Sequence, residues 1–507
     1  MVESFDVDVD VQRRNRAADD DTKLLIQIVQ ETTPVDFEAT ALSCKALFAA
    51  SAPFRAQYAT RRKRFQNFKF STKVDENLEG AEEPDLGDRW DKITQETGIK
   101  IVTTRELLEQ IALDPSVAQY IHSINLREHG DNEDDEEVIN SLETEVPRAL
   151  RDLVFTSPFI EAVEGNPDDW IGGIRESIID ADLFLLTLLP QVREIALHPR
   201  WDEVCPGNER LWSVLSLITY RANHQKEFPD TPLSMLSIVQ PSQDMGYEEK
   251  LQLTSFVPFL TINSVSEVNL GSCVFKDDGY TGYAFDPLVE CYSANLRKLS
   301  IESSVAGVEE LSQLLSRIPN LEIFEFSHET KWHGCGYNWN VGAFLDTVQD
   351  VCGKTLKELS VSNLTKWCNR GSTLVDMTRF QVLAVLELGV DMLCGPAYDP
   401  SMRALEWDET EWHGNPAWPK LIDMLPASIE KFNLYLETFD DDHLKCISHL
   451  IEGLSDARAT KLPHLNDLSL FVYVDSPKVP DMALEVLNAA KTSGFSILNF
   501  TTSDPLL

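Results

Sequence analysis

Two short segments of the sequence repeat the order tryptophan, histidine, glycine, and each is followed by a second tryptophan. Aromatic side chains with a polar group, such as tryptophan and tyrosine, bury a large area in a contact and can still form a hydrogen bond. They are therefore frequent at protein interfaces. With nearby aromatic residues they form a candidate surface for a partner protein: Tyr280, Tyr283, Trp332, His333, Trp339, Trp367, Trp412, His413 and Trp418. The alternative is that each ring packs beneath its own loop.

Residues that could hold a metal ion or perform catalysis are sparse. His333-Gly334-Cys335 is a single pair of ligands, and Asp440-Asp441-Asp442-His443 lacks a spaced fourth ligand. The sequence has no Gly-rich phosphate loop, no nucleophile elbow and no His-Glu-x-x-His motif. We therefore expect no catalytic residue, no metal and no cofactor. An enzyme with an unrecognised site is the less favoured alternative.

The charge of the chain limits its partners. The 83 acidic and 44 basic side chains give a net charge of -39, which repels phosphate backbones and anionic lipids. Neither nucleic acid nor a membrane is therefore expected as a partner. Acidic runs predict a disordered tail at 1–20 and a linker at 71–95.

Cysteines and apolar runs indicate the compartment. The nine cysteines include no C-x-x-C pair, a pattern typical of reduced thiols and not of a disulfide framework. The first residues are acidic and do not resemble a signal peptide. The most apolar run, Leu183–Leu189, is too short to span a membrane. These features favour a cytoplasmic and/or nuclear protein.

Residues 21–70 predict a small module of three helices. Apolar residues recur at helical spacing in the first helix, and Thr33-Pro34 can start the second. The second helix is expected to run through Phe48 with one apolar stripe, and Pro53 opens the third. Such a short module has a marginal core, so it needs a partner or the following domain.

The segment Val35–Phe48 resembles the central part of an F-box, with Leu42-Ser43-Cys44-Lys45 as the best match. The Leu-Pro that usually precedes the first helix of that family is replaced by Asp21-Thr22-Lys23. The resemblance implies a surface that binds the Skp-type adaptor of a cullin ligase, made of Leu24, Leu25, Ile28, Phe37, Leu42, Cys44 and Lys45. Without the family, the same helices could simply cap the array that follows.

From residue 96 to residue 507, the pattern apolar-x-x-apolar-x-apolar recurs ten times. The triplets begin at Ile121, Val192, Val265, Leu296, Leu321, Leu356, Leu383, Ile429, Leu465 and Phe495. Many follow a helical stripe, and four times a proline stands just before the strand. Units of one strand and one helix are typical of leucine-rich repeats, which stack because a single unit cannot bury its apolar face.

The sequence therefore predicts an α/β fold, a leucine-rich-repeat-like solenoid with parallel strands and outer helices. It resembles the irregular repeats that follow F-boxes in fungal proteins. The main alternative is an α/β domain with a mostly parallel sheet. Leu299, Leu359, Leu386 and Leu468 are expected in the core. The loops after the strands should share one edge: 271–286, 327–341, 362–373 and 389–419.

The resemblance implies a substrate-receptor subunit of a cullin-RING ubiquitin ligase. Residues 21–70 would bind the adaptor, and the array would bind a target protein that the sequence does not identify. The alternative is a leucine-rich-repeat scaffold with no link to ubiquitin.

Overall fold

The structure is a computed structural model with an α/β fold that contains a 14-stranded sheet. It describes residues 21–70, 100–127, 145–242, 245–276, 283, 285–331, 338–364, 369–371, 376–394, 420–436, 441–473 and 481–500. The expected tail 1–20 and linker 71–95 lie outside these ranges. The chain divides into two compact units. Unit 1 comprises Met1–His198 and Ser213–Leu236, and unit 2 comprises Pro199–Trp212 and Ser237–Leu507.

Unit 1 begins with the helical module. Residues 21–31 are helical. They are followed by α2 (Phe37–Ser43), α3 (Lys45–Ala50), α4 (Ala52–Phe65) and the short strand β1 (Asn67–Phe68). The single second helix expected through Phe48 is wrong, because the backbone at Cys44 is extended. The Ser43 hydroxyl donates to the Thr40 carbonyl at 2.8 Å, a local bond that competes with helix continuation.

The rest of unit 1 alternates short strands with helices. Its elements are α6 (Thr104–Leu113), α7 (Ser116–Tyr120), β2 (Ser123–Asn125), α9 (Arg148–Phe155), α10 (Pro158–Ala162), α11 (Pro167–Glu176), α12 (Ile178–Leu186) and β3 (Glu194–Ala196). A further helix, α13 (Glu209–Asn223), follows, and its residues from Ser213 onward belong to unit 1. Strands β1, β2 and β3 pair in parallel. The helices α9, α10, α11 and α12 lie between β2 and β3.

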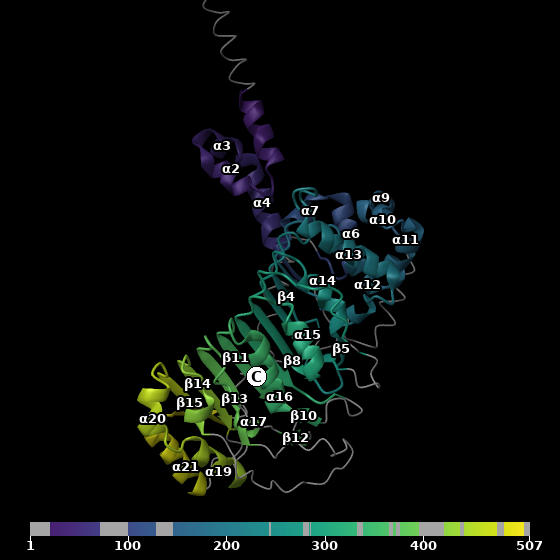
Figure 1. Cartoon of the computed structure of the whole chain (residues 1–507). Coiled ribbons are helices and arrows are strands. Elements are labelled where there is room, and N and C mark those ends of the chain that lie inside the picture. Colours follow the sequence, from purple (N-terminus) through teal and green to yellow (C-terminus); the bar gives the residue numbers. More distant parts are fainter. Residues whose placement is uncertain are drawn as a thin grey trace, which may run out of the picture. The chain divides into compact units, whose positions relative to one another are not determined.

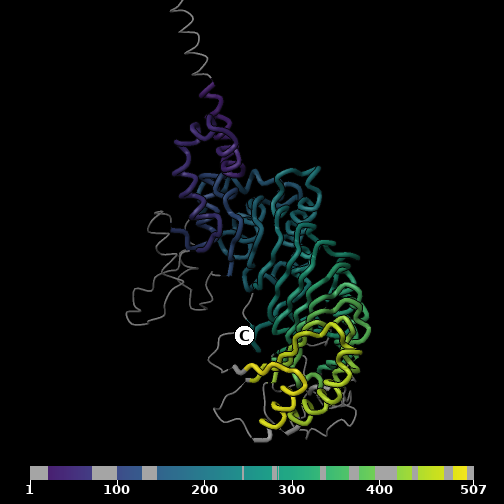
Figure 2. The backbone as a smooth tube through the Cα atoms, turned by 90° about the vertical axis from the view of Figure 1, so that its left-hand side faces the viewer, coloured from purple at the N-terminus to yellow at the C-terminus, as the bar shows by residue number. Residues whose placement is uncertain are grey.

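Unit 2 contains most of the sheet. Its strands follow in sequence order: β4 (Ile238–Gln240), β6 (Glu267–Gly271), β8 (Lys298–Ala306), β9 (Ile323–His328), β11 (Glu358–Asn363), β13 (Val385–Gly389), β14 (Lys431–Leu436), β15 (Asp467–Tyr473) and β16 (Ser496–Phe500). All of these neighbours pair in parallel. Figure 2 shows these strands side by side, from teal to yellow.

Shorter elements of unit 2 lie between these strands. The strands are β5 (Leu251–Gln252), β7 (Cys273–Phe275), β10 (Asn338–Asn340) and β12 (Asn369–Gly371), and the 3-10 helices are η1 (Trp201–Glu203) and η2 (Leu253–Phe256). The α-helices are α14 (Val257–Leu260), α15 (Val308–Leu315), α16 (Val341–Cys352), α17 (Val390–Cys394), α18 (Leu421–Met424), α19 (Asp441–Leu450), α20 (Leu454–Lys461) and α21 (Asp481–Thr492) (Figure 1).

The middle residues of the triplets form one line of core side chains across unit 2. Leu299, Phe324, Leu359, Leu386, Phe432 and Leu468 stand opposite one another in neighbouring strands. Each is at most 2% exposed. Helix α16 packs on this line, since the Phe344 ring stacks on that of Phe324 with centroids 6.4 Å apart. Burial of one such side chain contributes roughly 1.5–3 kcal/mol. The predictions of parallel strands at the triplets and of four buried leucines are confirmed.

The last strand departs from the triplet pattern. Phe471 of β15 stands opposite Leu498, and Leu470 stands opposite Ile497. Side chains alternate between the two faces of a strand, so this register turns Leu498 away from the core. It is 41% exposed. The triplet pattern therefore gives the correct strand here but not the inward residue.

Cysteines in the described ranges are mostly free thiols. Cys44, Cys205, Cys273, Cys291 and Cys352 are unpaired, as the sequence predicts. Cys446 is disulfide-bonded, which the expectation of reduced thiols did not include. No helix within the described ranges is long and apolar enough to cross a membrane.

Candidate interaction surfaces

The helical module has a small core of its own. Val29, Phe37 and Ala41 are at most 5% exposed. The Phe37 ring stacks on that of Tyr58 in α4 with centroids 4.3 Å apart, and Tyr58 in turn lies 5.8 Å from Tyr120 in α7. Arg61 forms an ion pair with Asp114. Helix α4 is therefore fixed to the remainder of unit 1.

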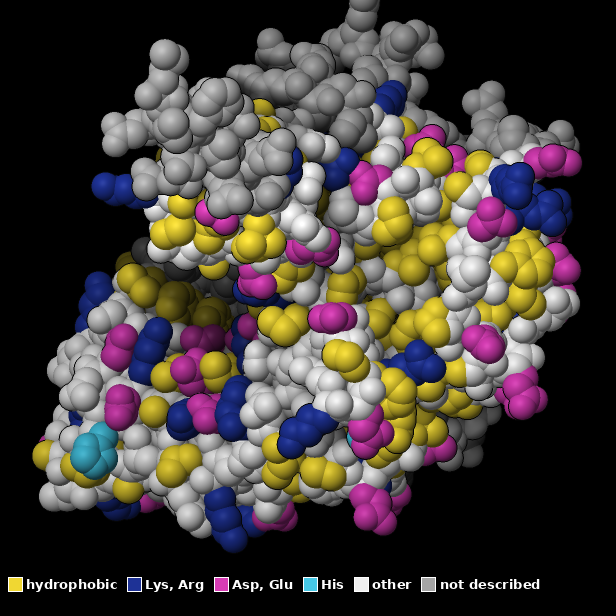
Figure 3. All heavy atoms as spheres, turned by 90° about the horizontal axis from the view of Figure 1, so that it is seen from above, with side chains coloured by type: hydrophobic (Ala, Val, Ile, Leu, Met, Phe, Trp, Pro, Cys, Tyr) yellow, Lys and Arg dark blue, Asp and Glu magenta, His cyan; other side chains and the backbone are white. Residues whose placement is uncertain are grey.

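The first half of the module displays large apolar side chains. Their exposed fractions are 57% for Leu24, 38% for Ile28, 54% for Val35, 75% for Leu42 and 46% for Phe48. We call these five residues the module's apolar face. Figure 3 shows hydrophobic side chains at the molecular surface among acidic and basic ones. Isolated exposed apolar residues are ordinary, but several within about thirty residues mark a candidate docking surface.

The residues expected to bind an adaptor fall into two groups. Leu24, Ile28, Leu42, Cys44 and Lys45 are exposed, and Leu25 is half-buried. Phe37 is 4% exposed and already packs inside the module. A role for Phe37 in contact with a partner would require the module to rearrange, so its contribution is to the fold of the module.

The expected aromatic surface lies largely outside the described residues. Tyr280, Trp332, His333, Trp367, Trp412, His413 and Trp418 are outside them, and Tyr283 is half-buried. Two of the four loops do meet, because β10 pairs in parallel with β12. These strands belong to the loops that follow β9 and β11.

Trp339 is packed. Its side chain is 4% exposed, and its ring stacks on His328 with centroids 4.3 Å apart. The Phe344 ring meets it edge-on at 5.5 Å. Trp339 is therefore buried, as expected if each ring packs beneath its own loop. We do not include Trp339 in a contact surface.

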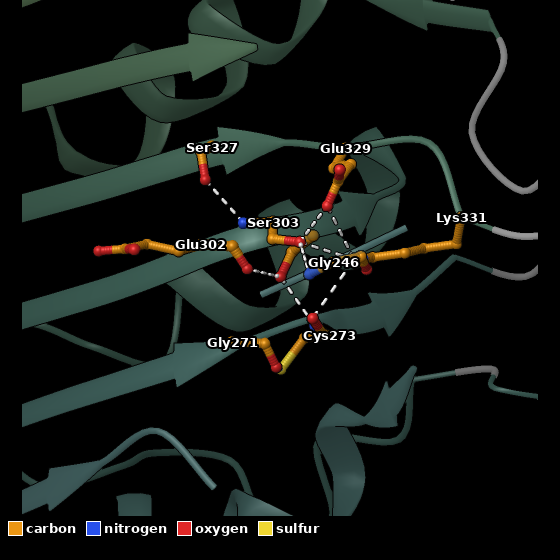
Figure 4. A network of polar contacts seen from close by, with 10 residues as sticks. Gly246, Gly271, Cys273, Glu302, Ser303, Ser327, Glu329 and Lys331 are labelled. Carbon is orange, nitrogen blue, oxygen red and sulfur yellow. Dashed lines mark hydrogen bonds and ion pairs between the residues drawn. The ribbon is translucent and has the colours of Figure 1, made fainter. Parts of the chain in front are cut away.

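A buried lysine follows the end of β9 and reaches Ser303 within β8 (Figure 4). The Lys331 side chain is 0% exposed. Its ammonium donates to the Gly246 carbonyl at 2.7 Å, to Ser303 Oγ at 2.7 Å and to Glu329 at 3.3 Å. Ser303 also donates to Glu329. This cluster was not foreseen, because its residues are far apart in the sequence and no local motif marks them.

The bulge in β8 places Ser303 in this cluster. The pairing of β8 with β9 is irregular between Ile301 and Ser304. Ser303 has a φ of +49°, in the left-handed region that side chains other than glycine rarely adopt. Its amide donates to Ser327 Oγ at 2.6 Å. The polar contacts thus stabilise an unfavourable backbone conformation.

The polar groups of this cluster are buried and stabilise the fold. Burial lowers the pKa of Lys331, while the neighbouring Glu329 carboxylate acts in the opposite direction. Burial raises the pKa of the adjacent Cys273 thiol to about 12, so the reactive thiolate is disfavoured. Lys331, Ser303 and Cys273 are all inaccessible to solvent. The hydrogen bonds of the Lys331 ammonium hold the segment at Gly246 against Ser303 of β8.

Neither metal candidate gains support. His333 and Cys335 lie outside the described residues, and so does Asp440. His443 is 8% exposed in α19. In the portion of the chain that the structure describes, no group of three or more His, Cys, Asp or Glu side chains could hold an ion.

No family model matches the chain, and no curated protein matches its sequence.

Proposed function

We propose that the chain is an interaction protein, the substrate-receptor subunit of a cullin-RING ubiquitin ligase. The module's apolar face would bind the Skp-type adaptor, and the sheet of unit 2, a leucine-rich-repeat-like solenoid, would bind the target protein. The observation that carries this proposal is the exposure of Val35, Leu42 and Phe48 in the segment whose sequence resembles an F-box.

The alternative that the module only caps the array accounts for part of the module. Strand β1 pairs with β2, and α4 packs against α7, as a cap requires. A cap gains nothing, however, from leaving Leu42 75% exposed and Phe48 46% exposed. Burial of these side chains against a partner would recover the hydrophobic stabilisation that the free chain lacks.

The proposal is tested by charging the apolar face. Ile28→Asp combined with Leu42→Asp should remove binding to a purified Skp-type adaptor, measured by calorimetry. Each side chain contributes roughly 1.5–3 kcal/mol when buried, so affinity should fall by a factor of about 100 or more. Both residues are exposed in the free chain, and circular dichroism should therefore be unchanged.

Leu113→Asp is the matched control, because Leu113 is 74% exposed in unit 1 but lies outside the module. It should leave adaptor binding intact. Equal losses in the two variants would point to a general effect of charge. A wild-type chain that does not bind the adaptor at micromolar concentration would remove the link to ubiquitin and favour the scaffold.

A further inference from the structure

Helix α3 is almost wholly apolar, yet none of its residues is buried. Phe48, its largest side chain, is 46% exposed. The first turns of α4 add exposed apolar surface at Ala52, Pro53 and Ala56 (Figure 1). A helix that is apolar on every side is normally covered by other elements. Residues 45–56, which we call the α3 surface, therefore have the character of one half of an interface.

The charge around the α3 surface is opposite to that of the whole chain. Residues 39–70 contain seven lysine or arginine residues and no aspartate or glutamate. The full chain, by contrast, has 83 acidic and 44 basic side chains. The acidic residues of the module all precede residue 39: Asp21, Glu31, Asp36 and Glu38. A partner that approaches the α3 surface is therefore selected for negative charge.

Two of the seven cations are free to meet a partner. The other five are engaged by other groups of the chain: Arg61, Arg62, Lys63, Arg64 and Lys69. Lys45 and Arg55 are exposed, and within the described residues neither forms a hydrogen bond or an ion pair. Both belong to the α3 surface, so its apolar side chains and its unpaired charges occur together.

Lys45 and Arg55 both lie beside Phe48. The guanidinium carbon of Arg55 is 4.4 Å from the centroid of the Phe48 ring. Lys45 precedes Phe48 by three residues in α3, a spacing that places two side chains on the same face of a helix. Contact with the ring restricts the guanidinium without using its hydrogen-bond donors, so less freedom is lost when it pairs with a carboxylate.

We propose that the α3 surface binds an apolar patch of a partner protein that is bordered by carboxylates, and that Lys45 and Arg55 pair with these carboxylates. Burial of Phe48 and of the neighbouring alanines supplies affinity. The ion pairs accelerate the encounter and select against basic surfaces. The inference deepens the proposed function and rests on it, because the partner of this surface is the Skp-type adaptor.

An anionic membrane is the other surface that attracts cations beside apolar side chains. The α3 surface offers two unpaired cations, whereas the chain as a whole has a net charge of -39. Anionic lipids repel the excess of carboxylates, and a membrane extends far beyond the α3 surface. A protein that covers only this surface avoids the repulsion, so we favour a protein partner.

A charge series at Arg55 tests the inference, with calorimetry of the full chain and a purified Skp-type adaptor. Arg55→Lys keeps the charge, Arg55→Gln removes it and Arg55→Glu reverses it. At low ionic strength, the dissociation constant should stay within about twofold for Arg55→Lys, rise roughly fivefold for Arg55→Gln and rise further for Arg55→Glu. At about 0.5 M salt, screening should reduce these differences to about twofold or less. Arg55 is exposed, so circular dichroism should be unchanged.

Arg151→Gln is the matched control, because Arg151 is an exposed arginine of α9 outside the module. It should leave adaptor affinity unchanged at both salt concentrations. Equal affinity across the Arg55 series at low salt, or the same loss in Arg151→Gln, would overturn the inference. The proposed function would then stand, because the adaptor would still bind.

Two further outcomes would also decide against the inference. A wild-type chain that does not bind the adaptor would remove the proposed function and the inference with it. Vesicles of phosphatidylserine are the second probe. If they bind the wild-type chain but not Arg55→Glu, while adaptor affinity is the same in both, the α3 surface contacts lipid and not protein.

Discussion

Asp182 is an acid that the fold encloses without a counter-charge. It lies in α12 with 0% exposure, and one carboxyl oxygen accepts from Thr104 Oγ1 of α6 at 2.6 Å. No described group donates to the other oxygen. Burial raises the pKa of Asp182 to about 8, and the Thr104 hydrogen bond acts in the opposite direction. The folded chain therefore favours the protonated acid at neutral pH.

This pKa predicts a pH dependence of stability. Because the folded-state pKa is above the unfolded value of 3.8, the folded state holds the proton more tightly. The contribution of Asp182 to the free energy of unfolding is complete below pH 3.8 and is lost as pH rises through about 8. Asp182→Asn cannot titrate, so the variant should gain stability relative to wild type as pH rises through that interval. Urea unfolding at several pH values measures this difference.

Thr104→Val is the companion variant. It removes the hydrogen bond to Asp182, which favours the ionised form, and leaves the burial of the acid unchanged. It should keep the pH dependence that Asp182→Asn abolishes. A free energy of unfolding whose pH dependence is the same in wild type and Asp182→Asn would show that Asp182 titrates as an ordinary exposed acid.

Individual strands obey one rule, that side chains alternate between the core and the outer face. Leu386 of β13 is 0% exposed, whereas Leu498 of β16 is 41% exposed, although both are the middle residues of a triplet. Leu386→Ala should lower the free energy of unfolding by roughly 2–5 kcal/mol, because it removes buried surface and leaves a cavity. Leu498→Ala should cost less than about 1 kcal/mol. Chemical denaturation compares the two.

Similar losses from the two substitutions would contradict the register of β16. The test is strict because both changes remove the same atoms, so the difference between the two losses reflects how deeply each side chain is buried. A large effect at Leu498 would mean that this residue, and not Ile497, faces the core.

The strands were predictable because a parallel strand under a layer of helices must repeat apolar residues. The burial of Leu299, Leu359 and Leu386 could be predicted from that pattern alone, without knowing which strands pair with each other. The break at Cys44 was not predictable from periodicity, since the Ser43 hydrogen bond is local and does not alter the apolar spacing.

Contacts between residues far apart in the sequence were harder to predict, for a physical reason. Glu387 and Asn433 are 46 residues apart, and their contact depends on the register of β13 against β14. One residue of slip would place them on opposite faces. Tryptophan content, by contrast, is visible in the sequence but does not reveal exposure, as Trp339 shows with 4%.

At the scale of the whole molecule, the net charge of -39 must oppose the compact state. Ion pairs offset little of it, because most described pairs are exposed. Arg148 and Asp152 have side chains 94% and 69% exposed, and those of Arg379 and Asp350 are 51% and 60% exposed. Exposed pairs contribute only about 0–1 kcal/mol each. Repulsion among carboxylates should therefore destabilise the folded chain by more than the exposed ion pairs stabilise it.

Salt should consequently stabilise this chain. The screening length falls from about 30 Å at 0.01 M to about 8 Å at 0.15 M ionic strength, which weakens long-range repulsion more than short contacts. The midpoint of thermal unfolding should rise over that interval and change little above it. Sodium chloride and choline chloride should act alike if screening is the cause, whereas an effect of ion type would continue to rise at molar concentrations. A midpoint that falls as salt is added would mean that the surface ion pairs, and not the excess of carboxylates, determine the electrostatic free energy of folding.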